Sequence, residues 1–139
     1  AGATRVRITL DARSKRGETS LLSPGLAEWQ GPCLCVYNDA QFDADDWRNL
    51  VRVGQASKLE KPETTGRFGL GFNSVYHYTD VPQLLSGEHV LFLDPHADGL
   101  VPGATAAQPG LRVRFTNGAR LRTAFPDQFE PWAALGCDL

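Results

Sequence analysis

The stretch from Thr64 to His77 reads Thr-Thr-Gly-Arg-Phe-Gly-Leu-Gly-Phe-Asn-Ser-Val-Tyr-His. Its three glycines, Gly66, Gly69 and Gly71, lie within six positions and lead into a run that can form a helix. Glycine permits backbone with positive φ and the close approach of another group. A turn of this kind before a helix N-terminus presents several N–H groups to a phosphate. A tight turn before a packed helix is the simpler alternative, and the stretch alone leaves both interpretations open.

Two established phosphate-binding motifs fit this stretch poorly. Gly66 and Gly71 have the P-loop spacing, but Phe72 stands where that loop needs the Lys that reaches the terminal phosphates. The dinucleotide fingerprint needs the order G-x-G-x-x-G after an apolar strand, whereas the order here is G-x-x-G-x-G after polar residues 60–65. A nicotinamide-dependent enzyme is therefore disfavoured.

Length, composition and charge set limits on the function. The 139 residues have the length of one domain, and 42% hydrophobic residues are enough to form a core. The formal net charge of −2 and the pI near 5.9 provide no basic surface for nucleic acid. The sequence contains no apolar run of membrane-spanning length and no recognisable signal peptide. Neither nucleic acid nor a membrane is therefore expected as a partner.

The cysteines and histidines predict neither a disulfide nor a metal site. Cys33 and Cys35 are one residue apart, so on a strand they point the same way and are poorly placed to bridge each other. An odd total of three cysteines is typical of reduced thiols in the cytosol, and a cytoplasmic protein is expected. The three histidines, His77, His89 and His96, are scattered without ligand spacing.

The first part of the chain predicts two strands. Residues 5–10 alternate between polar and apolar, as expected for a half-buried strand. Its apolar side carries Val6, Ile8 and Leu10. Residues 33–37 are almost continuously apolar, which predicts a central strand. This strand ends at Asn38 and Asp39, which form a turn signal.

A helix and a polar segment are predicted next. Asp43 is expected to cap the helix, with Asp46 three residues later completing a capping box. The buried stripe of this helix is expected to consist of Trp47, Leu50 and Val51. Residues 55–65 are charged and poor in apolar side chains, and their position before the glycines makes them a candidate lid.

The second half of the chain predicts strands with intervening turns. The helix after the glycines is expected to end near Thr79, before Pro82. Strands are predicted over 89–93 and 111–115, with a loop over 97–110 between them. A turn is predicted at residues 117–118, and residues 125–132 are expected to form an irregular or single-turn element.

The Thr64–His77 stretch resembles the second glycine box of the Bergerat-fold ATPases, the superfamily of gyrase, the ninety-kilodalton heat-shock chaperone, sensor histidine kinases and mismatch-repair ATPases. Within that superfamily the chain is most similar to the sacsin family. The motifs that carry this resemblance, in the same order, are Ala-Gly-Ala-Thr at 1–4, Val-Tyr-Asn-Asp-Ala at 36–40, the glycine box, Leu-Asp-Pro-His at 93–96 and Phe-Pro-Asp-Gln-Phe at 125–129. The resemblance implies an α/β fold, a two-layer α+β sandwich with a mixed β-sheet covered on one face by helices.

The resemblance also implies an ATP or ADP site. Asp39 matches the family's adenine-reading aspartate, with Asn38 beside it, because a carboxylate accepts a hydrogen bond from the exocyclic amine of adenine. A plain turn is the alternative role of Asn38 and Asp39. Ala40 and Phe42 stand where the superfamily usually has glycines. Lys58 resembles a lid lysine, with a solvated charge as its alternative role. The expected phosphate-binding residues are Gly66, Arg67, Phe68, Gly69, Leu70, Gly71 and Phe72.

In this superfamily a helix before the position of Ala1 carries an asparagine that binds Mg²⁺ and usually a glutamate that activates water. Residues 1–139 are therefore expected to form a partial domain without that first helix. No catalytic residue is assigned, and neither hydrolysis by this chain alone nor Mg²⁺ binding without an upstream segment is expected. Apolar surface is expected to be exposed beside Val6, Ile8 and Leu10.

The resemblance implies that the domain acts within a chaperone-like protein, with client or chaperone proteins as partners besides the nucleotide. The alternative is a nucleotide-independent interaction module derived from the same fold. Two observations favour this alternative. The Mg²⁺-binding asparagine and the water-activating glutamate of the superfamily are not among residues 1–139, and Ala40 and Phe42 stand at positions where the superfamily usually has glycines.

Overall fold

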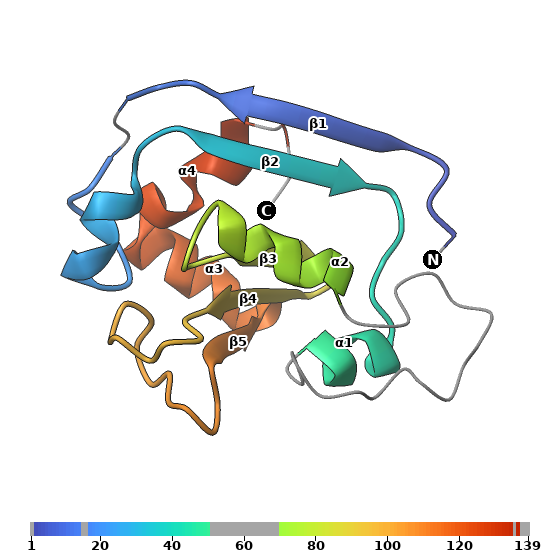
Figure 1. The fold of residues 1–139 in the computed structure, drawn as a ribbon. Helices are drawn as coiled ribbons and strands as arrows, with labels where there is room; N and C mark the ends of the chain where they lie inside the picture. The colour runs from blue at the N-terminus through green and yellow to red at the C-terminus, as the bar shows by residue number, and fades with distance from the viewer. Residues whose placement is uncertain (1, 15–16, 51–69, 135, 137–139) are drawn as a thin grey trace.

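The structure is a computed structural model that describes residues 2–14, 17–50, 70–134 and 136. It is an α+β protein with two small antiparallel sheets and several short helices (Figure 1). The fold class expected from the sequence is therefore confirmed. The candidate lid at 55–65, with Lys58, lies outside the described residues, as does the glycine box up to Gly69.

The first sheet is a ribbon of two strands, β1 (Val6–Asp11) and β2 (Cys33–Asn38). They pair antiparallel, from Val6 opposite Asn38 to Asp11 opposite Cys33. Among the described residues β2 pairs with β1 alone, so the expected central position of residues 33–37 is wrong. A continuous apolar run is also compatible with a two-stranded ribbon in which one side stays exposed.

The second sheet contains β3 (Gln83–Ser86), β4 (His89–Leu93) and β5 (Gly110–Arg114) in the order β3-β4-β5. Both pairs are antiparallel, and for β3 and β4 the tight turn between them permits no other direction. The expected single mixed sheet is therefore replaced by two antiparallel sheets in the described part of the chain. Central strand β4 is buried on both sides, and its apolar residues supply much of the core.

Helix α1 (Ala44–Leu50) begins at the capping box that the sequence predicts. The Asp43 carboxylate accepts hydrogen bonds from the backbone N–H groups of residues 45 and 46 at 2.7 and 2.8 Å. The Asp46 carboxylate accepts one from the Asp43 N–H at 3.2 Å, which completes the box. Trp47 and Leu50 are buried and pack against β4, so this part of the expected apolar stripe is confirmed.

The helical segment after the glycine box is short. It consists of α2 (Leu70–Asn73), followed by a 3-10 helix (Ser74–His77). Its end before Thr79 agrees with the expectation from Pro82. Phe72 packs against the cluster around Trp47, which anchors this segment to the core.

The C-terminal part of the chain differs from the sequence prediction. Helix α3 (Phe115–Ala124) passes through the predicted turn at 117–118, and α4 (Pro126–Ala134) replaces the predicted irregular segment. Proline is compatible with the first turn of a helix, so Pro126 does not prevent α4 from forming. Phe129 packs edge-on against Phe92 of β4 with ring centroids 6.0 Å apart. This tertiary contact stabilises the helix.

The loop between β4 and β5 is organised by a buried aspartate. Asp94 is 1% exposed, and its carboxylate accepts hydrogen bonds from the backbone N–H groups of Asp98 at 3.2 Å and Val101 at 3.1 Å. The Asp94 N–H donates to the carbonyl of Pro109 at 3.0 Å, which closes the loop at its base. The predicted loop at 97–110 is therefore confirmed up to the start of β5, with Asp94 holding it together.

Candidate functional site

Asp39 follows the last residue of β2, and its carboxylate is held by the start of the chain. Its Oδ1 accepts hydrogen bonds from the backbone N–H groups of Thr4 at 2.8 Å and Arg5 at 3.0 Å. Its Oδ2 accepts one from the Thr4 hydroxyl at 2.6 Å. The β1–β2 pairing brings these residues together, and the Asp39 N–H donates in return to the Arg5 carbonyl at 3.3 Å. We call this arrangement the Thr4–Asp39 clamp.

The clamp keeps Asp39 ionised. The Thr4 hydroxyl, followed by the backbone N–H groups of Arg5 and Thr4, lowers the pKa of the Asp39 carboxyl below its usual 3.8. An ionised carboxylate offers about four lone-pair positions to donors. Among the described residues, the three donors of the clamp leave one of these positions for a further donor, such as the exocyclic amine of adenine.

Asn38 takes the turn role that the sequence left open. Its side-chain Oδ1 accepts a hydrogen bond from the Ala40 N–H at 3.0 Å, which tightens the exit from β2. Phe42 is anchored farther along, because its N–H donates to the Ser86 hydroxyl at 2.8 Å. Its ring packs edge-on against Trp47 at 5.3 Å. The segment in which the superfamily usually has glycines is thus joined here to the second sheet.

Only the end of the expected phosphate loop is described. The backbone of Gly71 is open, because a Cβ added there would meet no heavy atom within 4 Å. The Phe72 ring packs edge-on against Tyr76 at 6.3 Å, so this side chain belongs to the core and only its backbone N–H suits a phosphate. The structural positions of Lys58, Gly66, Arg67, Phe68 and Gly69 lie outside the described residues.

The backbone amides expected to bind phosphate include that of Asn73, but no role was predicted for the side chain of this residue. Its side-chain Oδ1 is buried and accepts no hydrogen bond within the described part of the chain. A buried acceptor without a donor is costly, and such atoms occur where a ligand or water completes the site. The only signal in the sequence was its position directly after the glycine box.

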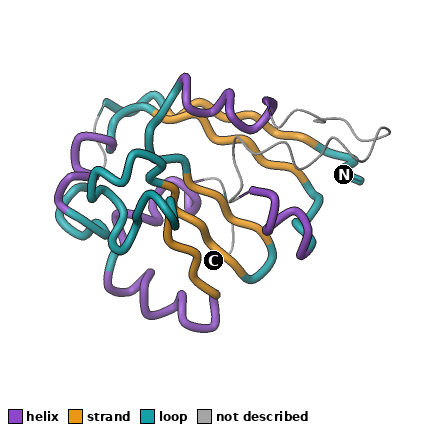
Figure 2. Tube along the Cα trace, turned by 60° about the horizontal axis from the view of Figure 1, so that its bottom comes forward, coloured by secondary structure: helices purple, strands orange, loops and turns teal. Residues whose placement is uncertain are grey.

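The two halves of the expected site lie at the same end of the molecule. Figures 1 and 2 both show the C-terminal end of β2 and the N-terminal end of α2 pointing to the side of the molecule where the N-terminus lies. The end of β2, which Asp39 follows, and the start of α2 therefore lie on the same side of the molecule.

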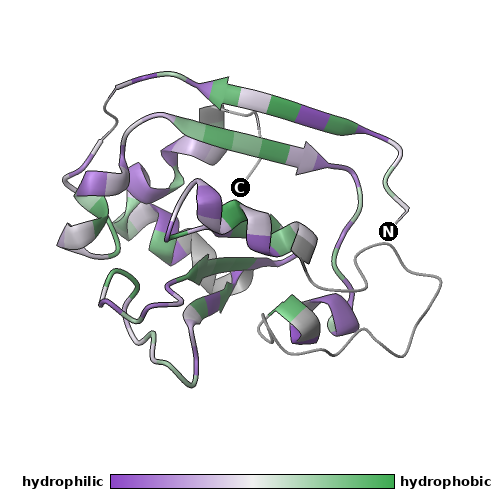
Figure 3. Cartoon of the chain, in the orientation of Figure 1, coloured by the Kyte–Doolittle hydropathy of each residue, from purple (hydrophilic) through white to green (hydrophobic). Residues whose placement is uncertain are grey.

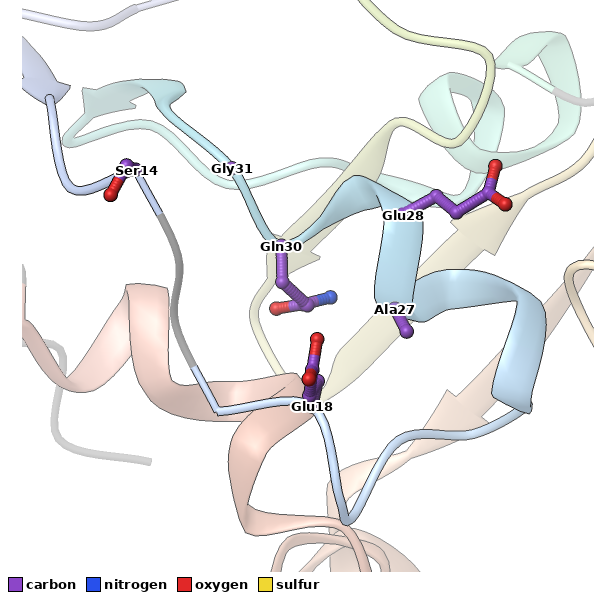
Figure 4. A pocket seen from close by; sticks show the side chains of 6 residues that line it. All are labelled: Ser14, Glu18, Ala27, Glu28, Gln30 and Gly31. Atoms are coloured by element: carbon purple, nitrogen blue, oxygen red, sulfur yellow. The ribbon is translucent and has the colours of Figure 1, made fainter.

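A separate surface pocket of about 340 Å³ lies between Ser14 and Glu18 on one side and the 3-10 helix Pro24–Trp29 with Gln30 and Gly31 on the other. In Figure 4 the Glu18 carboxylate points toward the side-chain amide of Gln30, whereas the Glu28 carboxylate points away. Gln30 is buried, and its Nε2 donates to the Leu26 carbonyl at 3.1 Å. Two carboxylates disfavour a phosphate here, and the pocket contains none of the expected site residues.

The described residues contain no group of three His, Cys, Asp or Glu side chains that could hold a metal ion. The sulfurs of Cys33 and Cys35 are 3.7 Å apart, well beyond the length of a disulfide bond. No helix in the described ranges is long and apolar enough to cross a membrane.

The fold and the candidate site define an α+β domain with an ionised aspartate after its second strand and a glycine box before a short helix. The profile of the family described as Sacsin domain matches residues 1–139. The chain therefore belongs to the Sacsin domain family. It is 34% identical over 142 residues to Sacsin of Homo sapiens, an alignment that covers 100% of this chain and 3% of that protein. The chain thus spans only a small part of the length of this relative.

Proposed function

We propose that this Sacsin-family domain binds an adenine nucleotide, ATP or ADP. The observation that carries the proposal is the position of the ionised Asp39 carboxylate and the start of α2 at one end of the molecule. The remaining lone-pair position of Asp39 would accept the exocyclic amine of adenine. The backbone N–H groups around Gly71 would bind phosphate oxygens, and the rest of the glycine box, with Arg67, would complete that loop.

The buried Oδ1 of Asn73 supports a ligand at this end of the chain. It is a buried acceptor next to the glycine box, and it still needs a donor within the described residues. A water that accompanies a bound nucleotide would supply one. No residue here is assigned to hydrolysis, and we propose Mg²⁺ binding only together with an upstream segment.

Calorimetric titration with ATP and ADP, with and without Mg²⁺, tests the proposal. Binding in the millimolar range or tighter is expected, and Asp39→Asn should abolish it because its amide group presents an N–H donor to the adenine amine. Asp98→Asn is the matched control, since it makes the same charge change at an exposed position and should leave affinity unchanged. The proposal fails if the chain binds no nucleotide, or if Asp39→Asn binds as well as the control.

A second variant separates adenine recognition from the clamp. Thr4→Val removes the hydroxyl donor from Oδ2 of Asp39 and frees one lone-pair position. It should therefore keep or increase the affinity for ADP, whereas Asp39→Asn loses it. Loss of affinity in both variants would show that the clamp supports the fold and does not leave room for the nucleotide.

A nucleotide-independent interaction module is the second candidate function. The exposed aliphatic side of the β1–β2 ribbon favours it, because large exposed apolar patches mark interaction sites. In either case we propose that the domain acts within a larger cytoplasmic, chaperone-like protein with client or chaperone proteins as partners. Membership of the Sacsin domain family supports this role.

A further inference from the structure

Cys33 and Cys35 form a pair of thiols on one side of β2. Residues two apart on a strand project from the same side, and here the two sulfur atoms lie 3.7 Å from each other. Both side chains are half-buried, so their sulfurs are partly accessible to a small ion in solution. The sequence indicated the shared side, but the distance between the sulfurs is set by the side-chain rotamers in the folded strand. We call Cys33 and Cys35 the thiol pair.

The residues of β1 that face the thiol pair leave the sulfurs as its soft ligand atoms. Cys33 lies opposite Asp11 and Cys35 lies opposite Thr9, and directly opposed residues of an antiparallel pair project from the same side. The carboxylate of Asp11 is engaged by the guanidinium of Arg13, whose Nη2 lies 2.6 Å from Oδ2. Figure 3 shows hydrophobic colour over most of β2. This strand therefore offers an ion two soft sulfurs in mainly apolar surroundings.

We infer that the thiol pair binds one Cu(I) ion, with both sulfurs as ligands. Thiolates are soft ligands that select Cu(I) and zinc among the common metals. Two thiolates suffice for Cu(I), a soft ion that forms complexes of low coordination number, whereas a structural zinc site takes four ligands. The pair supplies two sulfurs, and this number favours Cu(I) over zinc.

The distance between the sulfurs suits an ion that binds both of them. With metal–sulfur bonds of about 2.3 Å, an ion on the line between the sulfurs needs them about 4.6 Å apart, and a bent arrangement needs less. The observed 3.7 Å therefore has to increase by at most about 1 Å. Small rotations about the Cα–Cβ bonds of the two cysteines provide this change without a shift of the strand.

Binding is a ligand exchange without a redox step. Each thiol releases its proton to water, the two thiolates form bonds to Cu(I), and the ion keeps its oxidation state. Because protons are released, the affinity should increase with pH. A disulfide between the same two sulfurs is the competing product, and its formation needs an oxidant that takes up two electrons. The experiments therefore use reduced protein and exclude oxygen.

The inference does not rest on nucleotide binding. Failure of the calorimetric experiment leaves it intact, and absence of Cu(I) binding leaves the nucleotide proposal intact.

Anaerobic titration of the full chain with Cu(I) in competition with bicinchoninate, a chromophoric chelator, tests the site. One Cu(I) per chain should bind, and an excess of Zn²⁺ should not displace it. Cys33→Ser and Cys35→Ser should each raise the Kd at least about a hundredfold, because even the loss of a group behind a metal ligand costs roughly 10- to 100-fold. Cys137→Ser is the matched control, since it makes the same change at the third cysteine and keeps the thiol pair. It should leave the Kd unchanged.

Alkylation of the wild-type chain provides a second measurement, which needs no variant. Bound Cu(I) should slow the reaction of iodoacetamide with Cys33 and Cys35 at least about tenfold, because a coordinated thiolate is no longer a free nucleophile. Mass spectrometry of the digested protein resolves each cysteine, and the reaction of Cys137 serves as the internal control.

Four results would each overturn the inference. They are a chain that does not compete with bicinchoninate for Cu(I), displacement of Cu(I) by Zn²⁺, a Cys137→Ser variant that loses as much affinity as Cys33→Ser, and alkylation of the thiol pair at the same rate with and without Cu(I).

Discussion

The buried Asp94 is expected to contribute a large share of the stability of the domain. Its carboxylate accepts two backbone hydrogen bonds, from Asp98 and Val101, inside the loop that joins β4 to β5. Hydrogen bonds to a charged group contribute roughly 1.5–3 kcal/mol each. The Val101 N–H is buried and loses its acceptor in Asp94→Ala, whereas the Asp98 N–H can find water because it is only partly buried. The free energy of unfolding should therefore fall by about 3 kcal/mol.

Such a loss is large compared with the roughly 5–15 kcal/mol by which a domain is stable. It corresponds to a decrease in Tm of about 10 °C for a chain of this size. Asp94→Asn keeps one carbonyl oxygen as an acceptor and should lose about half as much. Asp98→Ala is the matched control, since its exposed side chain is removed while its backbone N–H remains, and it should change stability by less than about 0.5 kcal/mol.

Thermal and urea unfolding followed by circular dichroism measure these differences. The ranking from most to least stable should be wild type, Asp98→Ala, Asp94→Asn and Asp94→Ala. If Asp94→Ala melts together with Asp98→Ala, the two hydrogen bonds do not hold the loop and the reasoning is refuted.

The remaining predictions concern glycine positions and pH. Gly110→Ala should destabilise the fold by about 2 kcal/mol or more, because the added Cβ would lie 2.4 Å from the backbone oxygen of Phe92; Gly71→Ala, with open space around it, should change stability by less than about 1 kcal/mol in urea unfolding. Hydrogen bonds from the backbone and side chain of Ser20, and then from Thr19, lower the pKa of the Asp127 carboxyl below 3.8 in the folded protein. The ionised Asp127 therefore stabilises the fold fully above pH 3.8, and this stabilisation is lost as the pH falls through the pKa of the folded state. Stability measured from neutral pH to below 3.8 should decline less steeply in Asp127→Asn than in wild type, and identical slopes would contradict this origin.

Several local features could be predicted because their partners are close in the sequence. The capping box of Asp43 and Asp46 spans three residues, and strand β4 matches its predicted bounds. In contrast, α4 depends on the packing of Phe129 against Phe92, which no local pattern reveals. Its two prolines favoured an irregular segment until the core contact was known.

One part of the candidate site could likewise be predicted from the sequence, and another part could not. Asp39 was predicted from its motif, but its clamp by Thr4 joins residues 35 positions apart and arises only from strand pairing. The Oδ1 of Asn73 accepts no hydrogen bond from the described residues because it is buried, and the sequence does not specify burial. Whether Asp39 reads adenine stays a prediction.

By itself the sequence determined the family, the α+β class and the alternation of strand β1, because motif order and local periodicity are properties of neighbouring residues. The exposure of Val6, Ile8 and Leu10 agrees with what the resemblance implied. Only the tertiary structure decided that the acidic side chain of Asp94 is enclosed. The physical reason is that burial depends on which distant segments pack together, and a charged group becomes tolerable inside when backbone N–H groups surround it.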